Sequence, residues 1–597
     1  MVRARAFDDT GSIQIIFFNR PYIKNQLFRG QEYIFYGKPE RGYGGLSLTN
    51  PLFEKEGQGK ASGRIVPVYP LTEGLNRYVV ENAVREALER CPLPPDPLPP
   101  GMDRELGLPP RERAFWDIHF PPSLSKARMA LKRFAFEELF TFCCAFQRLK
   151  AGARTPLKRP LEALPAEDFL SLLPFEATSA QKKAISEAFS DMTSPYRMNR
   201  MLQGDVGSGK TAVAAACAWL CAKNGRQAVI MAPTEILARQ HQKTFDSLLR
   251  PMGIRVGLLV SSMAAGEKRQ ALELCRSGGL DIICGTHALI QKGVEFYDPA
   301  LFVIDEQHRF GVGQRSALYK KQPDAHMLVM SATPIPRTLS LIIFGDLDLS
   351  VLDSLPKGRQ KVQTYCVGRD KRLRALNFLQ KAVSEGGQGY IVCPLIEDGE
   401  SGRASAESYF KELSSYMPSL RLGLLHGKMG ALEKERVMEL FSKGELDVLV
   451  ATTVIEVGID VPNACIMIIE NAESFGLSQL HQLRGRVGRG QRESYCILIR
   501  NGPRTARLDA LCRINDGFLI AEEDLKLRGP GDFFGHRQHG LPEFKAADLS
   551  SDMDLFRTAL ERAQALIKKD PTLSLPENRL LRQEADRLIK DGGGKTN

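Results

Sequence analysis

The residues with the clearest chemical potential form a glycine-rich stretch, Gly204-Asp-Val-Gly-Ser-Gly-Lys210-Thr211. Its GxxxxGKT spacing lets backbone N–H groups converge on phosphates, and the helix expected from Thr211 onward presents its positive end to the same charge. Lys210 is expected to hold the β and γ phosphates, and Thr211 to bind Mg²⁺. A glycine-rich turn without a ligand is disfavoured, because a chance match is rare. The predicted nucleotide site comprises Gly204, Asp205, Val206, Gly207, Ser208, Gly209, Lys210 and Thr211.

A metal-binding carboxylate and a base stand together in LFVIDEQH, at the end of an apolar run. Asp305 is expected to hold Mg²⁺, and Glu306 to polarise the attacking water. Such a pair is commonly only a solvated strand end. Here it follows the glycine-rich loop by about a hundred residues in a series of alternating strands and helices, which favours catalysis.

Phosphoryl transfer also needs cations where negative charge develops, and QLHQLRGRVGRG supplies Arg484, Arg486 and Arg489. Glycines between them leave the backbone free to present the side chains. An arginine finger from a second lobe would make hydrolysis depend on lobe closure. The alternative for this run is a solvated loop or a generic phosphate-binding patch.

The composition is typical of a soluble globular protein of 597 residues, with 43% hydrophobic and 25% charged residues. Its longest apolar stretches, such as 212–222, are shorter than the ~18 residues of a membrane span, and the first residues lack a secretory signal. Twelve cysteines without a CxxC pair indicate reduced core cysteines in a cytosolic protein. The net charge of +11 is compatible with a polyanionic partner.

The elements that position these residues begin with a small all-β module. Residues 1–60 alternate polar and apolar positions in VRARAF, SIQIIFF, EYIFYG and GLSLTN, which predicts an OB-type barrel. The chain starts almost inside a strand, so we expect the natural start to lie upstream. Residues 61–170 form a connector, with helical patterns over Tyr78–Arg90 and Lys126–Leu149 around the proline-rich CPLPPDPLPPG.

Two α/β lobes follow. Residues 171–355 contain the apolar runs QAVIMAP, DIICGT, LFVIDE and HMLVMSAT, and residues 356–500 contain GYIVCPLI, LRLGLLHG, DVLVATT, CIMIIEN and YCILIR. Strands that alternate with helices predict a parallel sheet covered on both faces in each lobe. Residues 501–597 are rich in Gly and Arg and then helical, which predicts a small C-terminal domain.

The motifs GDVGSGKT, APTEILARQH, GTHALIQ, DEQH, SATPIPRT, ATTVIEVGIDVPNA and QLHQLRGRVGRG, in this order, resemble those of superfamily-two helicases and translocases. The tail GFLIAEEDLKLRGPGDFFGHRQHG resembles a motif of the RecG family and of the transcription-repair coupling factor. FFNRPYIKNQLFRGQEYIFYGK resembles the RecG wedge domain. The resemblance covers residues from about 2 to 560. It implies an α/β fold with two tandem RecA-like parallel-sheet lobes, preceded by an OB-type wedge domain and followed by a C-terminal helical domain.

The resemblance also implies roles for single residues. Gln181 matches a glutamine that reads adenine, the alternative being a surface helix residue. Ser331 and Thr333 would couple the nucleotide state to lobe motion, or else cap a strand-end turn. DNA-backbone contacts are implied for Thr234, Thr286, His287 and Thr453, for which helix caps are the alternative. Gly458 and Asp460 match the motif that links the nucleotide to DNA in the second lobe, and the arginine-finger motif is matched by Gln482, Arg486 and Arg489. Conversion of hydrolysis into translocation is implied for Arg528 and Gln538, with Arg507 a weaker candidate. A structural salt bridge or amide is the alternative for these.

Substrate choice is expected to reside in the wedge. Phe18 and Tyr22 match positions where aromatic faces stack on bases exposed at a DNA junction, at ~1 to 3 kcal/mol per base. Phe17, Phe18 and Tyr22 could equally pack in the barrel core.

The expected activity is that of an ATP-dependent double-stranded-DNA helicase and translocase. It would reverse replication forks, migrate Holliday junctions and remove R-loops or D-loops in recombination and repair, with ATP and Mg²⁺ as cofactors. Branched and double-stranded DNA are the expected partners, with single-stranded-DNA-binding protein as a further one. A monomer in the bacterial cytoplasm, at the nucleoid, is expected.

The alternatives are a transcription-repair coupling translocase, disfavoured because no polymerase-binding module is evident, and a DNA-junction binding protein with an inactive nucleotide site. A primosomal helicase would carry paired zinc cysteines.

Overall fold

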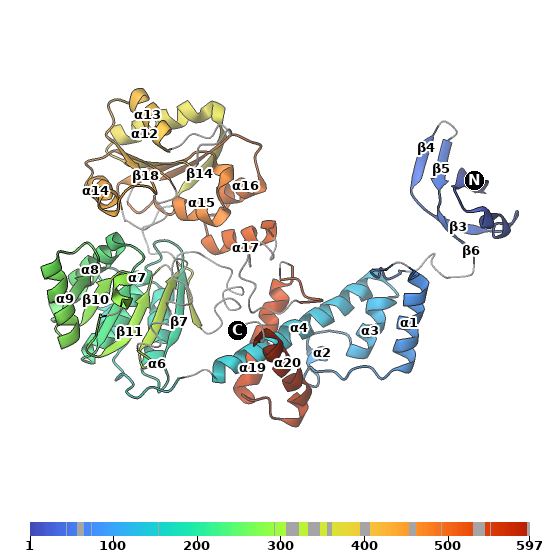
Figure 1. The fold of residues 1–597 in the computed structure, drawn as a ribbon, viewed down its shortest axis with the longest axis horizontal. Helices are drawn as coiled ribbons and strands as arrows, with labels where there is room; N and C mark the ends of the chain where they lie inside the picture. The colour runs from blue at the N-terminus through green and yellow to red at the C-terminus, as the bar shows by residue number, and fades with distance from the viewer. Residues whose placement is uncertain are drawn as a thin grey trace. The chain divides into compact units, whose positions relative to one another are not determined.

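The computed structural model divides the chain into two compact units (Figure 1). The first comprises Met1–Arg148 and His539–Asn597, and the second comprises Leu149–Gln538. This division cuts the segment 501–597, predicted as one domain, at Gln538. The structure describes residues 1–42, 45–56, 65–72, 74–152, 155–291, 293–305, 322–331, 347–354, 361–394, 406–452, 461–490, 492–528, 544–549 and 551–593.

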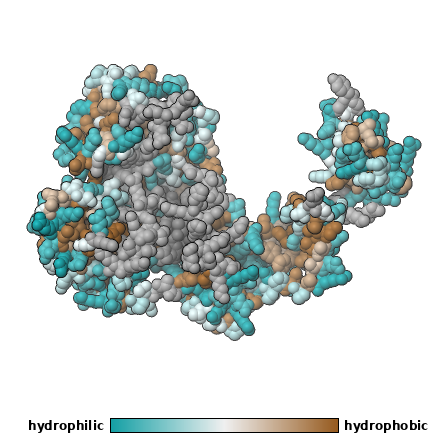
Figure 2. Space-filling model, viewed as in Figure 1, coloured by the Kyte–Doolittle hydropathy of each residue, from teal (hydrophilic) through white to brown (hydrophobic). Residues whose placement is uncertain are grey.

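Two small sheets make up the N-terminal module of the first unit. The larger has the strand order β1-β2-β5-β4, formed by β1 (Val2–Asp8), β2 (Gly11–Phe17), β5 (Gly45–Thr49) and β4 (Pro39–Gly42). The smaller pairs β3 (Tyr33–Tyr36) with β6 (Leu52–Lys55) in antiparallel register. Ile15, Phe17, Ile23 and Leu48 form their shared core, against which Phe35 and Phe53 pack. Mostly hydrophilic residues cover the visible face of the module (Figure 2).

The all-β character predicted for this module is confirmed, although two of its strands were not expected. The strand β4 begins at Pro39 and lies at the edge of its sheet. Proline is tolerated at such an edge because its missing N–H is not needed there. The sequence PERG therefore shows none of the alternation that marks the other strands.

The remainder of the first unit is helical. Its helices are α1 (Arg77–Arg90), α2 (Met102–Glu105), α3 (Arg111–His119), α4 (Leu124–Gly152), α19 (Met553–Lys569) and α20 (Arg579–Gly593). The two helical patterns of the connector correspond to α1 and α4, and the last residues of α4 enter the second unit. Beside α1 and α3, apolar residues reach the surface (Figure 2), among them the exposed Tyr78 and Val79.

A buried arginine holds the proline-rich segment against α4. Nη2 of Arg133 donates to both carboxylate oxygens of Asp96, at 2.6 and 2.7 Å, and its Nη1 donates to Glu137 Oε2 at 2.8 Å. Arg111 donates to Glu137 and, at 2.8 Å, to the carbonyl oxygen of Pro94. Prolines lack an N–H, so such a segment cannot join a helix or an interior strand. Side chains of the helices therefore supply its fixed contacts.

The first lobe of the second unit contains an all-parallel sheet of order β13-β7-β12-β11-β8-β10-β9. Its strands are β7 (Asn199–Gly204), β8 (Gln227–Met231), β9 (Val256–Leu259), β10 (Ile282–Gly285), β11 (Pro299–Ile304), β12 (His326–Ser331) and β13 (Asp348–Leu352). Its helices include α6 (Ser179–Met192), α7 (Lys210–Lys223), α8 (Glu235–Leu249) and α9 (Ala265–Ser277). In a parallel sheet the carboxyl ends of all strands share one edge, where ligands bind.

The second lobe contains an all-parallel sheet of order β14-β19-β18-β15-β17-β16. Its strands are β14 (Gln363–Gly368), β15 (Gln388–Val392), β16 (Leu422–Leu425), β17 (Val448–Ala451), β18 (Ala464–Ile469) and β19 (Tyr495–Arg500). Its helices include α12 (Arg372–Ser384), α13 (Ala406–Tyr416), α14 (Ala431–Ser442), α15 (Leu477–Arg484), α16 (Ala506–Arg513) and α17 (Gly517–Arg528). Both parallel-sheet lobes predicted from the sequence are confirmed. Among the described residues, no helix has the length and hydropathy to cross a bilayer.

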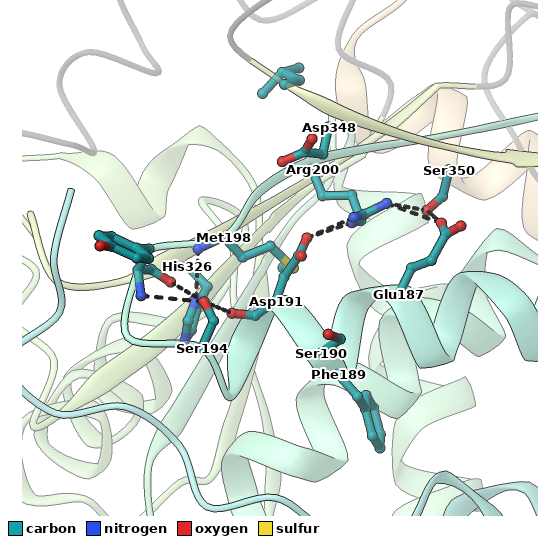
Figure 3. A network of polar contacts seen from close by, with 12 residues as sticks. Glu187, Phe189, Ser190, Asp191, Ser194, Met198, Arg200, His326, Asp348 and Ser350 are labelled. Carbon is teal, nitrogen blue, oxygen red and sulfur yellow. Dashed lines mark hydrogen bonds and ion pairs between the residues drawn. The ribbon is translucent and has the colours of Figure 1, made fainter. Parts of the chain in front are cut away.

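A nearly buried arginine ties α6 to two strands of the first lobe (Figure 3). Arg200 on β7 donates to Asp191 at 2.8 Å, to Glu187 at 3.1 Å and to the Ser350 hydroxyl on β13 at 2.7 Å. Ser350 in turn donates to Glu187 at 2.5 Å. Burial raises the pKa of Asp191, against the opposing effect of Arg200. The network fixes α6 against the sheet, and α6 carries the candidate adenine reader.

Because His326 is buried at the start of β12, the free energy of unfolding is expected to fall in mild acid. Its Nδ1 accepts the backbone N–H of Met198 at 3.0 Å (Figure 3), and burial lowers its pKa to about 4. Because this pKa lies below the unfolded value of about 6.5, the unfolded state takes up the proton first. The contribution of neutral His326 to stability is therefore fully present above pH 6.5. The free energy of unfolding falls by up to about 3 kcal/mol as the pH drops to 4.

Fluorescence of Trp219, which is buried in the first-lobe core, can measure this loss once Trp116 is replaced by Phe. Urea midpoints should fall between pH 7 and pH 5. In a His326→Gln variant, whose amide oxygen can still accept the Met198 N–H, the fall should be smaller. Equal pH dependence in both proteins would contradict the prediction.

Candidate functional site

The glycine-rich loop joins β7 to α7 at the carboxyl edge of the first sheet. Gly207 and Gly209 have φ values of +77° and +85°, a region that favours glycine. At Gly204 a Cβ atom would lie 2.9 Å from Cβ of Leu352, so only glycine fits without movement. Lys210, the first residue of α7, donates through Nζ to the carbonyl oxygens of Gly204 at 2.8 Å and Asp205 at 3.0 Å. The loop thus has the compact form that a phosphate cradle needs.

The same loop fits a nucleotide phosphate and its cation. Gly209, the N-cap of α7, supplies no side-chain cap, so the positive N-terminal end of the helix faces the loop as an anion site requires. Ser208 Oγ is fully buried and has no hydrogen-bond partner among the described residues. Thr211 follows in the first turn, where its hydroxyl would bind Mg²⁺, and Val206 of the loop is buried.

Gln181 on α6 contacts this loop directly. Its Nε2 donates to the carbonyl oxygen of Ser208 at 2.9 Å, and its Oε1 accepts the N–H of Thr178 at 2.9 Å in a capping box. The side chain is 1% exposed. The alternative of a surface helix residue is therefore wrong. One N–H and one lone pair of the amide remain for a base, so adenine reading stays a prediction.

Asp305 follows β11 and is nearly buried. His241 on α8 bonds through Nε2 to Asp305 Oδ2 at 2.8 Å and so orients the carboxylate. This histidine was not expected from the sequence. Its only signal is that it ends the motif APTEILARQH, seven residues after Thr234. Glu306, the expected base, lies outside the described residues.

The residues of the first lobe that are expected to contact the DNA backbone follow strands at the carboxyl edge of the sheet, as the glycine-rich loop does. Thr234 follows β8 and caps α8, accepting the Leu237 N–H at 3.4 Å. Thr286 follows β10; it is buried, and its hydroxyl has no partner among the described residues. The neighbouring His287 is exposed. Thr234 therefore does act as a helix cap, and a DNA contact remains a prediction for all three residues.

The arginine motif of the second lobe surrounds the end of α15. Gln482 lies within the helix, Arg486 is nearly buried just after it, and Arg489 donates to the Gly485 carbonyl oxygen at 3.3 Å. Arg484 is structural: it donates to the carbonyl oxygens of Leu511, Ile514 and Asn515. Burial lowers its pKa.

A histidine within this motif contacts the glycine-rich loop. Nε2 of His481 lies 2.8 Å from Asp205 Oδ1, and Nη2 of Arg484 lies 2.8 Å from His481 Nδ1. Because a guanidinium only donates, Nδ1 must accept and Nε2–H must donate to Asp205. The second lobe thus reaches the nucleotide loop through a ring whose tautomer is fixed. This pairing was not expected from the sequence, where its only sign is the position of His481 next to Gln482.

The other candidates divide between described and undescribed residues. Ser331 ends β12 and is fully buried, and Arg528 is the last residue of α17. Arg507 lies in α16. Thr333, Thr453, Gly458, Asp460 and Gln538 lie outside the described residues. On the N-terminal module, Phe17 is fully buried in the core, whereas Phe18 is 47% and Tyr22 is 55% exposed.

Comparison with known proteins identifies the family. Models of four protein families match the chain: DEAD/DEAH box helicase at residues 178–342, helicase conserved C-terminal domain at 371–491, the C-terminal part of domain 3 of ATP-dependent DNA helicase RecG at 514–592, and the RecG wedge domain at 1–91. ATP-dependent DNA helicase RecG of Bacillus subtilis is 41% identical over 590 residues, which cover 97% of this chain and 86% of that protein. That of Escherichia coli O127:H6 is 41% identical over 96% of this chain and 86% of its own length.

A solved structure of RecG bound to a three-way DNA junction is 39% identical, with a TM-score of 0.66, over 93% of this chain and 75% of that chain. The nucleotide loop, the tandem parallel sheets and the N-terminal module therefore occur in the order of these relatives. The chain belongs to the RecG family of ATP-dependent DNA helicases.

Proposed function

We propose that this helicase moves on double-stranded DNA and remodels branch points, reversing replication forks, migrating Holliday junctions and removing R-loops or D-loops. The proposal is supported by the relative whose structure holds a three-way DNA junction. A single chain suffices for the cycle, because the glycine-rich loop and the arginine motif both belong to it. Membership of the family accounts for the helicase activity, and we attribute the preference for a DNA branch point to the N-terminal module.

The described residues support separate roles for individual side chains in ATP hydrolysis. Lys210 and the N–H groups of the loop would hold the phosphates of ATP, and Thr211 and Asp305 would hold Mg²⁺, with His241 orienting the carboxylate. Bound Mg²⁺ supplies positive charge that offsets the charge of the phosphates. Glu306 would polarise the water, while Gln482, Arg486 and Arg489 would stabilise the developing charge.

Lobe motion would follow from this chemistry. Gly458, Asp460, Ser331 and Thr333 would link the nucleotide to the DNA-contacting loops that carry Thr234, Thr286, His287 and Thr453. Because His481 donates to Asp205 of the nucleotide loop, a change in that loop alters a contact with the second lobe. Arg528 and Gln538 would convert the resulting movement into translocation.

The observation that carries branch specificity is the exposure of two aromatic rings on the N-terminal module. Phe18 and Tyr22 are about half exposed beside the fully buried Phe17, so they do not belong to the module core. Phe18 is held at its backbone, where its N–H donates to Asn50 Oδ1 at 2.9 Å. An aromatic face on a fixed backbone can stack on a base unpaired at the junction, at ~1 to 3 kcal/mol per base.

Replacing Phe18 and Tyr22 together with Ala is expected to reduce fork regression by at least about tenfold, because two stacking contacts of ~1 to 3 kcal/mol each are lost. ATP turnover on linear duplex should fall much less. The measurement compares regressed product on a synthetic fork with phosphate release on linear duplex. Phe28→Ala is the matched control, since Phe28 is also exposed on this module. An unchanged regression rate in the double variant would contradict branch recognition by these rings.

A further inference from the structure

The two lobes also contact each other through α8 of the first lobe and α14 of the second. Nε of Arg239 donates to Oε1 of Glu435 across this contact at 3.1 Å, and the two side chains are 40% and 26% exposed. Ile236, three residues before Arg239, packs against the core of the second lobe. Residues three apart lie on one face of a helix. One face of α8 therefore presents both an apolar and a charged side chain to the second lobe.

Arg239 is oriented by its own lobe. Its Nη2 donates to Ser262 Oγ at 3.2 Å. Ser262 is held in turn by Glu235, whose carboxylate accepts the Ser262 N–H at 3.2 Å and the Ser262 hydroxyl. Ordering a long side chain costs entropy when an ion pair forms, which is why exposed pairs contribute little to stability. Because these contacts within the lobe already restrict the guanidinium, less entropy is lost when it pairs with Glu435.

Opposite charges continue along the same two helices. Lys243 follows Arg239 by one turn of α8, and Glu439 follows Glu435 by one turn of α14. A hydrogen bond from Lys443 lowers the pKa of Glu439, and the charge of Lys243 lowers it further from the first lobe. A basic side of α8 thus faces an acidic side of α14. We call these two pairs, together with Ile236, the α8–α14 contact.

The α8–α14 contact lies apart from the hydrogen bond between His481 and Asp205. In the first sheet, β7 leads to the nucleotide loop and β8 leads to α8, and these strands are three positions apart. In the second sheet, β18 and β16, which lead to α15 and α14, are also three positions apart. Three strand spacings of about 4.8 Å amount to about 14 Å. Two bodies that touch at one point can rotate about it, so a second contact at this distance restrains the angle between the lobes.

We propose that Arg239 and Glu435 are positioning residues that hold the two lobes, before ATP binds, in the arrangement where the arginine motif faces the nucleotide loop. This inference goes beyond branch remodelling and rests on the proposed nucleotide site. Because the pair is partly exposed, it favours the arrangement and still lets the lobes separate. The apparent affinity for a ligand falls with the fraction of molecules in the binding-competent arrangement. Loss of the pair should therefore weaken the binding of ATP, which would contact both lobes.

The first test measures the affinity of the full-length chain for a fluorescent, non-hydrolysable ATP analogue without DNA. Arg239→Glu and Glu435→Arg each place like charges opposite one another, so each should weaken binding about fivefold. The variant that carries both changes should regain an affinity within about twofold of wild type. The matched control reverses the charges of Arg276 and Glu295, an exposed ion pair at 3.3 Å within the first lobe. Arg276→Glu and Glu295→Arg should leave the affinity unchanged.

The second test needs no nucleotide. A carbodiimide joins an amine to a neighbouring carboxylate without a spacer, and in Arg239→Lys it should cross-link position 239 to Glu435. Mass spectrometry of the digested protein should identify a peptide of α8 joined to one of α14. Adding Glu435→Gln to Arg239→Lys should remove this cross-linked peptide, because the carboxylate is lost.

Three results would overturn the proposal: an unchanged affinity in both single variants, a double variant that binds no better than either single one although its urea midpoint equals that of wild type, or no cross-link in Arg239→Lys. Failure of the nucleotide site has a different signature. A wild type that binds no analogue, while Arg239→Lys yields the cross-link, would contradict the nucleotide site and support the α8–α14 contact.

Discussion

Lys210→Ala is expected to lower ATP turnover at least about 100-fold, the size of effect seen when one charge-stabilising donor is removed. The lysine is the first residue of α7 and donates to the Gly204 and Asp205 carbonyl oxygens. Its ammonium is thus already placed at the loop that would receive the phosphates. Without it, the loop loses a cation where negative charge develops during phosphoryl transfer.

Phosphate release with duplex DNA at saturating ATP measures this effect. Lys223→Ala is the matched control, because Lys223 is the exposed last residue of the same helix. Its turnover should equal that of the wild type. The buried Trp219 should show the same emission in all three proteins if the lobe stays folded. A turnover in Lys210→Ala within tenfold of wild type would contradict the assignment of the nucleotide site.

Arg133→Met is expected to destabilise the first unit by about 3 kcal/mol, because removal of one partner from a buried ion pair leaves an uncompensated charge. Arg133 is fully buried and serves both Asp96 and Glu137. Burial already raises the pKa of Glu137, while Arg111 and Arg133 lower it. Without Arg133 this carboxyl would bind a proton more readily in the folded than in the unfolded state. The destabilisation should therefore shrink as the pH falls from 8 to 5.

Urea unfolding followed by Trp116 on α3 measures this change in a Trp219→Phe background, because the chain has two tryptophans. Lys132→Met is the control, since Lys132 is the exposed neighbour on α4. Adding Asp96→Asn to Arg133→Met should restore part of the stability. An unfolding midpoint in Arg133→Met equal to that of Lys132→Met would show that the buried arginine does not hold the proline-rich segment.

The sequence predicts the interior strands better than the edge strands. The strands β8, β11, β12, β15 and β18 are buried along their whole length and appear in the sequence as continuous apolar runs. The strands β13 and β14 lie at the edges of their sheets, where one side lacks a neighbour and polar residues are tolerated. No apolar run marks them, so neither was expected.

The spacing of residues within one motif also predicts the nucleotide loop, because all of these residues lie in a single loop and at the start of the helix that follows it. The partners His241 of Asp305 and His481 of Asp205 could not be predicted in this way. These pairs are separated by 64 and 276 residues. A hydrogen bond over such a separation depends on how whole elements pack, which the periodicity of a single sequence does not encode. For the same reason the burial of Gln181 against Ser208 was visible only in the fold.

The side-chain contacts of helix α4 restrict the insertions and deletions that this helix can accept. Arg133, Glu138 and Arg148 project toward partners from three distant parts of the chain, at angles set by an uninterrupted spiral. Deleting one residue between Glu138 and Arg148 would turn every later side chain by about 100° and carry Arg148 away from Asp586. An insertion of seven residues, close to two whole turns, would preserve the phase. Length changes in this helix should accordingly come in near-integral turns.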